Sequence, residues 1–152
     1  MTSLQIREKK ISQVDSLMWK VTKLLTKQKK ILLDEFDLTC SQFEILAAIY
    51  EFTKDKKNEV IQINLSEKAN IDPMTTSTVL RNLQKRNLIK RERGLVNTRT
   101  VEVELTTEGE KLYCLAQQKL NRMTKDIYQN LDQQQLTSQL LKLSDKLNKL
   151  KY

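Results

Sequence analysis

Apolar residues recur every three or four positions along most of this chain of 152 residues, and Gly and Pro together occupy only three positions. This spacing places apolar side chains on one face of a helix, and few Gly or Pro residues are present to break helices. Hydrophobic residues make up 39% of the sequence, enough for one core without a metal or a disulfide. The sequence therefore predicts one mainly α (α+β) domain over residues 1–152.

The absence of histidine is the strongest argument against catalysis. It removes the commonest general base, the usual partner of a nucleophile and the commonest metal ligand. The Asp and Glu residues form no pair in a Gly-rich or strand-end context that would indicate a shaped active site. We therefore expect no enzyme activity, no metal and no cofactor.

Neither a membrane span nor a disulfide framework is indicated. The longest uninterrupted apolar run, Ile45 to Tyr50, is far shorter than the roughly 20 residues that a span needs, and no apolar stretch resembles a signal peptide. We expect a cytoplasmic protein with no membrane partner and with reduced cysteines. Cys40 lies at a predicted helix N-terminus, where the dipole favours thiolate, so it is either a redox-sensitive thiol or a small packed residue. Cys114 is the weaker redox candidate.

The positive charge of the chain is concentrated in one segment. The net charge is +8, and the 28 residues from Pro73 to Thr100 hold seven basic side chains and one acidic one. That segment has a net charge of +6, which leaves +2 for the other 124 residues. A surface that binds a polyanion concentrates charge in this way, whereas the alternative, a solvated helix face, has no such requirement.

Helix start signals divide the first half of the chain. A long amphipathic helix is predicted over about residues 5–33. Thr39 and Gln42 then form a capping box that opens a second helix, which ends before a polar connection at 53–59. A short third helix follows over residues 61–69. The apolar stripe of the first helix consists of Ile11, Val14, Met18, Val21, Leu25 and Leu32.

A fourth helix is predicted between two asparagines. Asn70 and Asn87 tolerate the left-handed backbone conformation in which a chain leaves a helix. Between them, Asp72 is a good N-cap and Pro73 suits the first helical position, so the helix should cover about residues 73–86. Its buried side is expected to consist of Thr76, Val79, Leu80 and Leu83.

A two-stranded hairpin and two further helices complete the predicted order. The strands are residues 88–92 and 101–105, of which the second alternates apolar and acidic residues. Thr107 and Glu110 form a capping box that opens the next helix. The last helix carries a strict heptad stripe, which consists of Leu136, Leu140, Leu143, Leu147 and Leu150.

This order of elements is typical of a winged helix-turn-helix, here over residues 38–106, whose fourth helix and β wing coincide with the concentrated charge. The fourth helix is interpreted as a recognition helix that enters the major groove of double-stranded DNA. The alternative for any one Thr or Ser is that it only decorates a first helical turn. We expect base contacts from Thr75, Ser77, Thr78 and Arg81, with Asn82 on the same face, phosphate contacts from Lys85 and Arg86, and wing contacts from Arg91, Arg93 and Arg99, of which Arg93 and Arg99 can enter the minor groove.

Three groups of residues together resemble the MarR (multiple antibiotic resistance regulator) family over nearly the whole chain. The resemblance implies an obligate homodimer in which the terminal helical regions, residues 1–37 and 107–152, interlock. It also implies an effector, which in this family is a small phenolic molecule, an oxidant or a metal; the absence of histidine disfavours the metal. The matching residues are Leu38, Thr39, Gln42, Ile45 and Leu46, then Leu65, Ile71 and residues 83–89, then Leu105, Thr106 and Gly109.

The sequence departs from the MarR pattern at two places. Asn97 stands where the family usually has an Asp two residues before a conserved Arg, here Arg99, so a charge-assisted pair becomes at best a neutral hydrogen bond. Ser77 and Thr78 stand where the family often has a Thr-Arg pair, which moves the nearest arginine to Arg81. We therefore expect an operator that differs from the common ones of the family.

The apolar stripes of the first and last helices are larger than one small core can easily cover. A second subunit would cover them, although each stripe could instead pack within its own chain. A two-fold dimer places its recognition helices about 34 Å apart, which predicts an inverted-repeat operator. The sequence thus predicts a homodimeric, ligand-responsive transcriptional repressor. The alternative is a helical interaction protein whose winged element binds a protein partner, and the clustered charge weighs against it.

Overall fold

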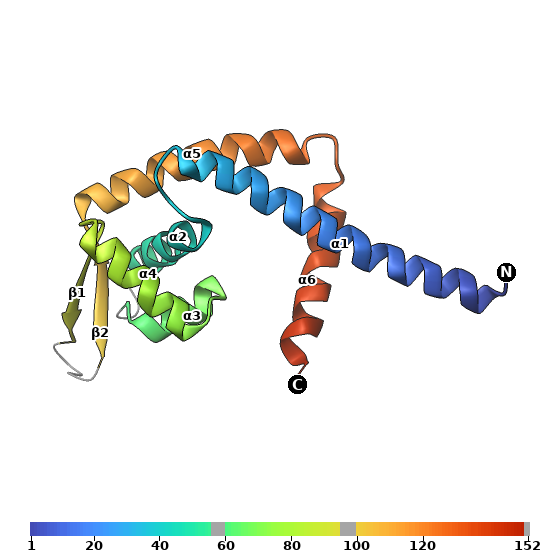
Figure 1. The fold of residues 1–152 in the computed structure, drawn as a ribbon, viewed down its shortest axis with the longest axis horizontal. Helices are drawn as coiled ribbons and strands as arrows, with labels where there is room; N and C mark the ends of the chain where they lie inside the picture. The colour runs from blue at the N-terminus through green and yellow to red at the C-terminus, as the bar shows by residue number, and fades with distance from the viewer. Residues whose placement is uncertain (56–59, 95–99, 151–152) are drawn as a thin grey trace. The chain divides into compact units, whose positions relative to one another are not determined.

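The computed structural model describes the chain apart from residues 56–59, 95–99 and 151–152 and apart from the side chains of residues 8–12. Its elements form two compact units, Met1–Gln118 and Lys119–Tyr152. The mainly helical fold with one two-stranded antiparallel sheet is confirmed (Figure 1). The elements are α1 (Ser3–Asp34), α2 (Cys40–Asp55), α3 (Gln62–Ala69), α4 (Pro73–Lys85), β1 (Ile89–Arg93), β2 (Val101–Leu105), α5 (Thr107–Tyr128) and α6 (Gln133–Lys149).

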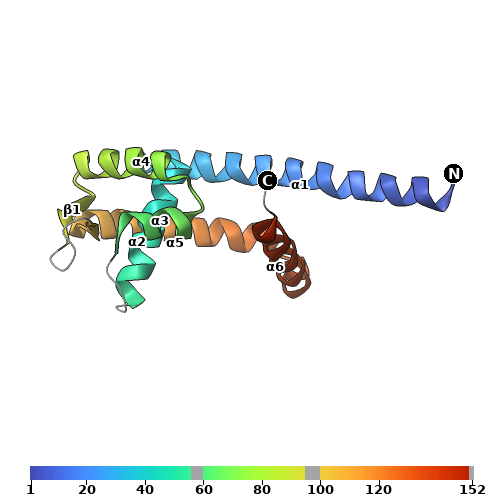
Figure 2. The ribbon, with the colours of Figure 1, turned by 90° about the horizontal axis from the view of Figure 1, so that it is seen from below.

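Helix α1 packs against α2 near its C-terminal end. A capping box between Thr2 and Gln5 opens it, slightly earlier than predicted. Near its end Leu33 is 1% exposed, and Asp37, in the left-handed conformation with φ 52°, turns the chain toward α2. Figures 1 and 2 show the N-terminal half of α1 extending away from α2, α3 and α4. The side chain of Ile11, predicted to begin the apolar stripe, lies outside the described residues.

Helices α2, α3 and α4 supply most of the core of this unit. The predicted capping box of α2 is confirmed, because Thr39 and Gln42 exchange two side-chain hydrogen bonds of 3.0 Å each. The predicted connection at 53–59 begins too early, since α2 continues to Asp55. Thr53 remains in the helix by donating its hydroxyl hydrogen to the Ile49 carbonyl at 2.7 Å. The fully buried side chains of the three helices are Ile45, Leu46, Ile49, Leu65, Thr76, Leu80 and Leu83.

The turn between α3 and α4 follows the predicted local rules. Asn70 has φ 54°, and the Asp72 carboxylate accepts a hydrogen bond of 2.8 Å from the Thr75 amide at the start of α4. The Ser66 hydroxyl donates to the Ile71 carbonyl at 2.6 Å and so satisfies a backbone group inside the turn. The start of α4 is therefore set by short-range hydrogen bonds on both sides of the turn.

The hairpin forms the expected wing, with β1 and β2 paired so that Ile89 faces Leu105 and Arg93 faces Val101. The first strand begins one residue later than predicted, because Leu88 still donates its amide hydrogen to Leu83 at the end of α4. A further backbone bond of 2.8 Å, from Val103 to the Val60 carbonyl, holds β2 to the chain before α3. The tip of the hairpin, residues 95–99, lies outside the described residues.

The cap of α5 is Thr106, which corrects the predicted capping box of Thr107 and Glu110. The Thr106 hydroxyl accepts a hydrogen bond of 3.0 Å from the Gly109 amide and donates one of 2.8 Å to the Asn87 carbonyl. Gly109 lies so close to the Leu88 carbonyl that a Cβ atom would collide with it. Thr106 therefore connects the ends of α4, the wing and α5 within the first unit.

The second unit contains the end of α5 and the whole of α6. Asp132 caps α6 by accepting a hydrogen bond of 3.1 Å from the Gln135 amide. No residue of α6 is buried, and four leucines of the predicted heptad stripe, Leu140, Leu143, Leu147 and Leu150, are 37–59% exposed. Within the described part of the chain, none of the helices has both the length and the apolar character that crossing a membrane requires.

Candidate nucleic-acid interface

A basic surface covers the solvent side of α4 and β1. We use this name for Arg81 and Lys85 of α4 and Lys90, Arg91 and Arg93 of β1. Arg91 is half-buried and the other four side chains are exposed. None of the five forms a salt bridge with another described residue. Arg99, and with it Asn97, lies outside the described residues.

The buried side of α4 fixes which residues face outward. Thr76, Leu80 and Leu83 are completely buried, as predicted. This anchoring leaves Thr75, Thr78, Arg81, Asn82 and Lys85 exposed and Ser77 half-buried, so the predicted base-contacting face exists as one side of a helix. The structure brings these six residues together along α4.

The hydroxyl groups of that face have partners within the helix. Thr75 donates its hydroxyl hydrogen to the Asp72 carboxylate at 2.6 Å, and Thr78 donates to the Met74 carbonyl at 3.2 Å. The Thr75 contacts lower the pKa of the Asp72 carboxyl group below its usual range, because they stabilise the carboxylate. What these two threonines present to the solvent is therefore an acceptor oxygen and a methyl group rather than a free donor.

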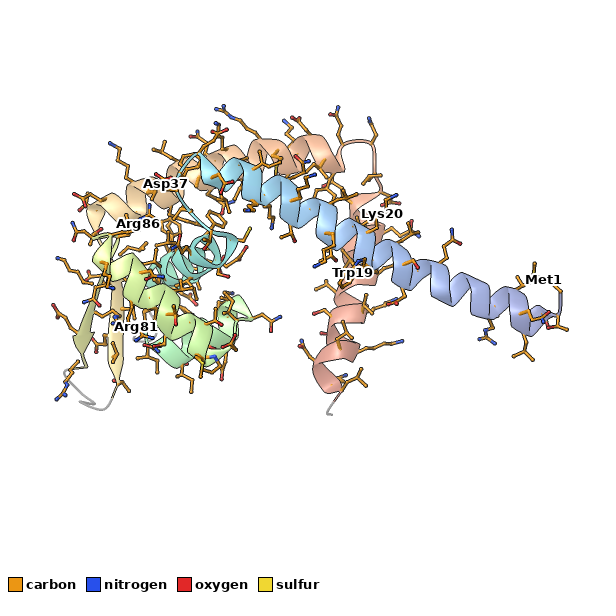
Figure 3. All side chains as sticks on the ribbon, in the orientation of Figure 1. Met1, Trp19, Lys20, Asp37, Arg81 and Arg86 are labelled. Carbon is orange, nitrogen blue, oxygen red and sulfur yellow. The ribbon has the colours of Figure 1, made fainter. Side chains whose placement is uncertain are left out.

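Arg86 lies at the end of α4 but is directed toward another element. Its Nη1 donates to the Asp37 carbonyl at 2.6 Å and to Oε1 of Gln42 at 3.5 Å (Figure 3). The contact joins the C-cap of α4 to the turn between α1 and α2. Arg86 was predicted to contact phosphate, and the structure gives its guanidinium group a structural partner 49 residues earlier.

Arg91 and Arg93 occupy different positions on the wing. The Arg91 Nε donates to Oε1 of Gln84 at 2.8 Å, which directs this guanidinium toward α4. Arg93 is exposed in the last pair of the ladder, next to the hairpin tip. The two arginines therefore extend the basic surface from α4 to the wing.

Sequence reasoning missed two exposed residues of this region. Met74, in the first turn of α4, is 81% exposed, although it is a large apolar side chain. Lys90 was counted in the charge of the segment but was not included among the predicted contacts. The signal for Met74 was available, because the spacing that buries Thr76, Val79 and Leu80 leaves residue 74 outside the core stripe.

The predicted thiol and the described acidic residues add no chemistry to this surface. Cys40, at the first residue of α2, is half-buried, Cys114 of α5 is exposed, and both are free cysteines. Among the described residues, no cluster of His, Cys, Asp or Glu could hold a metal ion. The redox role of Cys40 stays a prediction.

A cavity of about 370 Å³ lies beside the start of α4, between α3 and β2. Ile61 and Ile63 of the α3 region, Pro73 of α4 and Val101 of β2 line it, so its wall is mostly apolar. Ser66 also lines the cavity, but its hydroxyl hydrogen is already donated to the Ile71 carbonyl.

Comparison with known proteins connects this arrangement with transcription regulators. Residues 27–114, more than half of the chain, match the transcriptional regulator SarA/Rot family. The HTH-type transcriptional regulator YhbI of Bacillus subtilis strain 168 is 32% identical over 127 residues, which cover 82% of this chain and 79% of YhbI.

Two solved structures have the same fold. The structure of S. aureus MepR in complex with DNA is 24% identical, with a TM-score of 0.76 over 86% of this chain and 94% of MepR. The regulator BldR from Sulfolobus solfataricus is 18% identical, with a TM-score of 0.77 over 96% of this chain and 99% of BldR. The chain therefore belongs to the SarA/Rot family of transcriptional regulators, whose MarR-like winged-helix fold agrees with the predicted resemblance.

Proposed function

We propose that this chain is a sequence-specific DNA-binding repressor that acts as a homodimer on an inverted-repeat operator. The observation that carries the proposal is the basic surface, whose five cations lie on the solvent side of a recognition helix and its wing without a salt bridge to another described residue. Cations of this kind bind DNA phosphates favourably, because neutralising the phosphates releases their condensed counterions. The MepR structure in complex with DNA supports a nucleic-acid partner for this fold.

The face of α4 divides into base-reading and phosphate-binding parts. Arg81 is the leading base-contacting residue, because a guanidinium group can pair with guanine through two hydrogen bonds and its one described partner is Thr78 at 3.5 Å. Ser77 and Asn82 accompany Arg81 on this face, and Lys85 lies toward phosphate. The proposed wing contacts are Arg91, Arg93 and Arg99.

The proposed dimer uses the unburied apolar residues of α1 and α6. Val14, Leu17 and Trp19 of α1 are 62%, 50% and 69% exposed, and α6 has no buried residue at all. A second copy of the chain would remove these side chains from water. The two recognition helices would then read two half-sites about one turn of DNA, roughly 34 Å, apart.

We further propose that the repressor responds to a small-molecule effector, with a candidate site in the cavity beside α4. Its volume of about 370 Å³ falls within the range of small-molecule sites. The cavity touches both the first turn of the recognition helix, through Pro73, and the wing strand, through Val101. A small apolar ligand there would contact the two elements proposed to bind DNA. By shifting them, it would weaken DNA binding and relieve repression.

Selection from a random duplex library followed by affinity measurement tests the function. We expect wild-type protein to enrich an inverted repeat, and Arg81→Ala to bind it about 10- to 100-fold more weakly with relaxed preference at one base pair per half-site. The matched control is Lys68→Gln, because Lys68 is a cation of α3 already paired with Glu51 at 3.1 Å. If wild type enriches no sequence and binds all duplexes as Arg81→Ala does, the protein-partner alternative replaces this proposal.

A further inference from the structure

Met74 is the exception to the pattern of buried apolar side chains on the recognition helix. It follows Pro73 in the first turn of α4 and keeps 81% of its surface exposed. The aliphatic residues Val79, Leu80 and Leu83 of the same helix are at most 7% exposed. Met74 is therefore an apolar group that the core of the first unit does not use.

The position of Met74 along α4 determines which part of a duplex it can meet. The N-terminal residues of a recognition helix reach the base edges in the major groove. The charges along α4 agree with this orientation, since the first turn carries no charged side chain while Arg81 and Lys85 lie in later turns. Arg81 and Lys85 suit the sugar-phosphate backbone and its neighbourhood, which leaves the uncharged first turn for the base edges.

The two threonines on this face of α4 have no hydroxyl hydrogen left to donate to a base. The hydroxyl hydrogens of Thr75 and Thr78 are donated to the Asp72 carboxylate and to the Met74 carbonyl. Guanine and adenine present acceptors in the major groove that require donors, whereas thymine presents a C5-methyl group. An exposed thioether chain flanked by a threonine methyl group matches the thymine methyl.

We propose that Met74 is a specificity-determining residue that packs against the C5-methyl group of one thymine in each half-site. This inference rests on the proposed DNA binding. The Met side chain is flexible and polarizable, so it can follow the surface of a methyl group, and the contact removes apolar surface of both molecules from water. One buried methyl group corresponds to about a fourfold gain in affinity per half-site.

Replacement of thymine by deoxyuridine tests the proposal, because it removes only the methyl group. The probe is the tightest duplex that the full-length wild type selects from the random library, with each symmetric pair of thymines replaced in turn. At one pair we expect wild-type affinity to fall about 15-fold, fourfold for each half-site. Met74→Ala should bind the thymine and deoxyuridine duplexes with equal affinity at that pair.

Two further variants separate base reading from general damage. Lys68→Gln changes an exposed side chain of α3 that is paired with Glu51, and it should keep the full deoxyuridine penalty. Met74→Gln places an amide that can pair with adenine N6 and N7 at this position, so selection should change the preferred base from thymine to adenine. Because Met74 is exposed, thermal unfolding should show the same melting temperature for wild type and both Met74 variants.

The outcomes distinguish this inference from the proposed function. A selected duplex that tolerates deoxyuridine at every position overturns the role of Met74 and leaves DNA binding intact. The same holds if Met74→Ala and wild type lose equal affinity at every replaced pair. If wild type selects no sequence from the library, the proposed function fails, and the role of Met74 fails with it.

Discussion

Helices α4 and α6 are both amphipathic, but their apolar sides have different surroundings. Thr76, Leu80 and Leu83 of α4 are completely buried, whereas α6 has no buried residue and its Leu147 is 59% exposed. The apolar side of α4 is completed by α2 and α3 of the same chain. The stripe of α6 obtains no such cover within the described residues, and an exposed stripe of this kind is typical of an interaction surface.

Helix α1 contains both buried and exposed apolar side chains. Leu33, near its C-terminal end, is 1% exposed, whereas Val14 and Trp19 are 62% and 69% exposed. Figure 2 shows the N-terminal half of α1 extending away from α2. One chain therefore suffices for the winged-helix core, and the proposed dimer accounts for the apolar residues that this core does not cover.

Truncation of the buried side of α4 should have the largest effect. Leu83→Ala removes three carbon atoms from a completely buried site, so we expect the free energy of unfolding to fall by about 3 kcal/mol. Urea denaturation followed by circular dichroism measures the change. A loss below about 1 kcal/mol would contradict the packing described for this helix.

Charges placed on the stripe of α6 should act on assembly instead. Leu140→Asp with Leu147→Asp would bury carboxylates at the proposed dimer interface, so we expect the dissociation constant to rise at least about 100-fold. Light scattering after size-exclusion chromatography at low micromolar concentration measures the mass. The control variant, Gln134→Asp with Ser138→Asp, changes polar positions of the same helix and should remain dimeric. A monomeric wild type would contradict the proposed dimer.

The features of the fold that could be predicted are set by residues close in sequence. Asn70 and Asn87 were expected to leave their helices with left-handed backbone, and both have positive φ, 54° and 58°. The cap of α5 was misassigned because Thr106 and Thr107 are both good caps. Thr106 is selected by its bond to the Asn87 carbonyl, 19 residues earlier, which local rules do not include. The Val103–Val60 backbone bond was missed for the same reason.

In the candidate site, too, some features could be predicted from the sequence and others could not. The location of the charge and the outward face of α4 follow from composition and helical spacing, and both could be predicted. The use of each side chain depends on atoms that spacing does not place. Thr75 gives its hydroxyl hydrogen to its own N-cap, and Arg86 reaches the Asp37 carbonyl. A sequence pattern identifies a side chain that can contact DNA, but it does not show whether the protein already uses that side chain.

The adjacent cations Lys85 and Arg86 allow a comparison within α4 itself. Arg86→Gln removes the bond to the Asp37 carbonyl, so we expect the free energy of unfolding to fall by about 1 kcal/mol while the salt dependence of DNA binding stays the same. Lys85→Gln should leave stability unchanged and reduce the slope of log affinity against log salt concentration by about 0.9 per subunit. Equal loss of slope in both variants would make Arg86 a phosphate contact.

Replacement of Asp72, the N-cap of α4, should have the smallest effect on stability, and this effect should depend on pH only in the acid range. The folded-state pKa of Asp72 is lowered, first by the Thr75 hydroxyl and then by the Thr75 amide. The charge therefore contributes stability that is complete above the ordinary aspartate pKa of about 3.9 and is lost as the pH falls through the lowered folded value. Asp72→Asn keeps a cap that does not titrate, so the stability advantage of wild type should shrink as the pH falls below about 4. Urea denaturation at each pH measures it, and an advantage that stays constant over this range would show that the charge of Asp72 does not contribute to the start of the recognition helix.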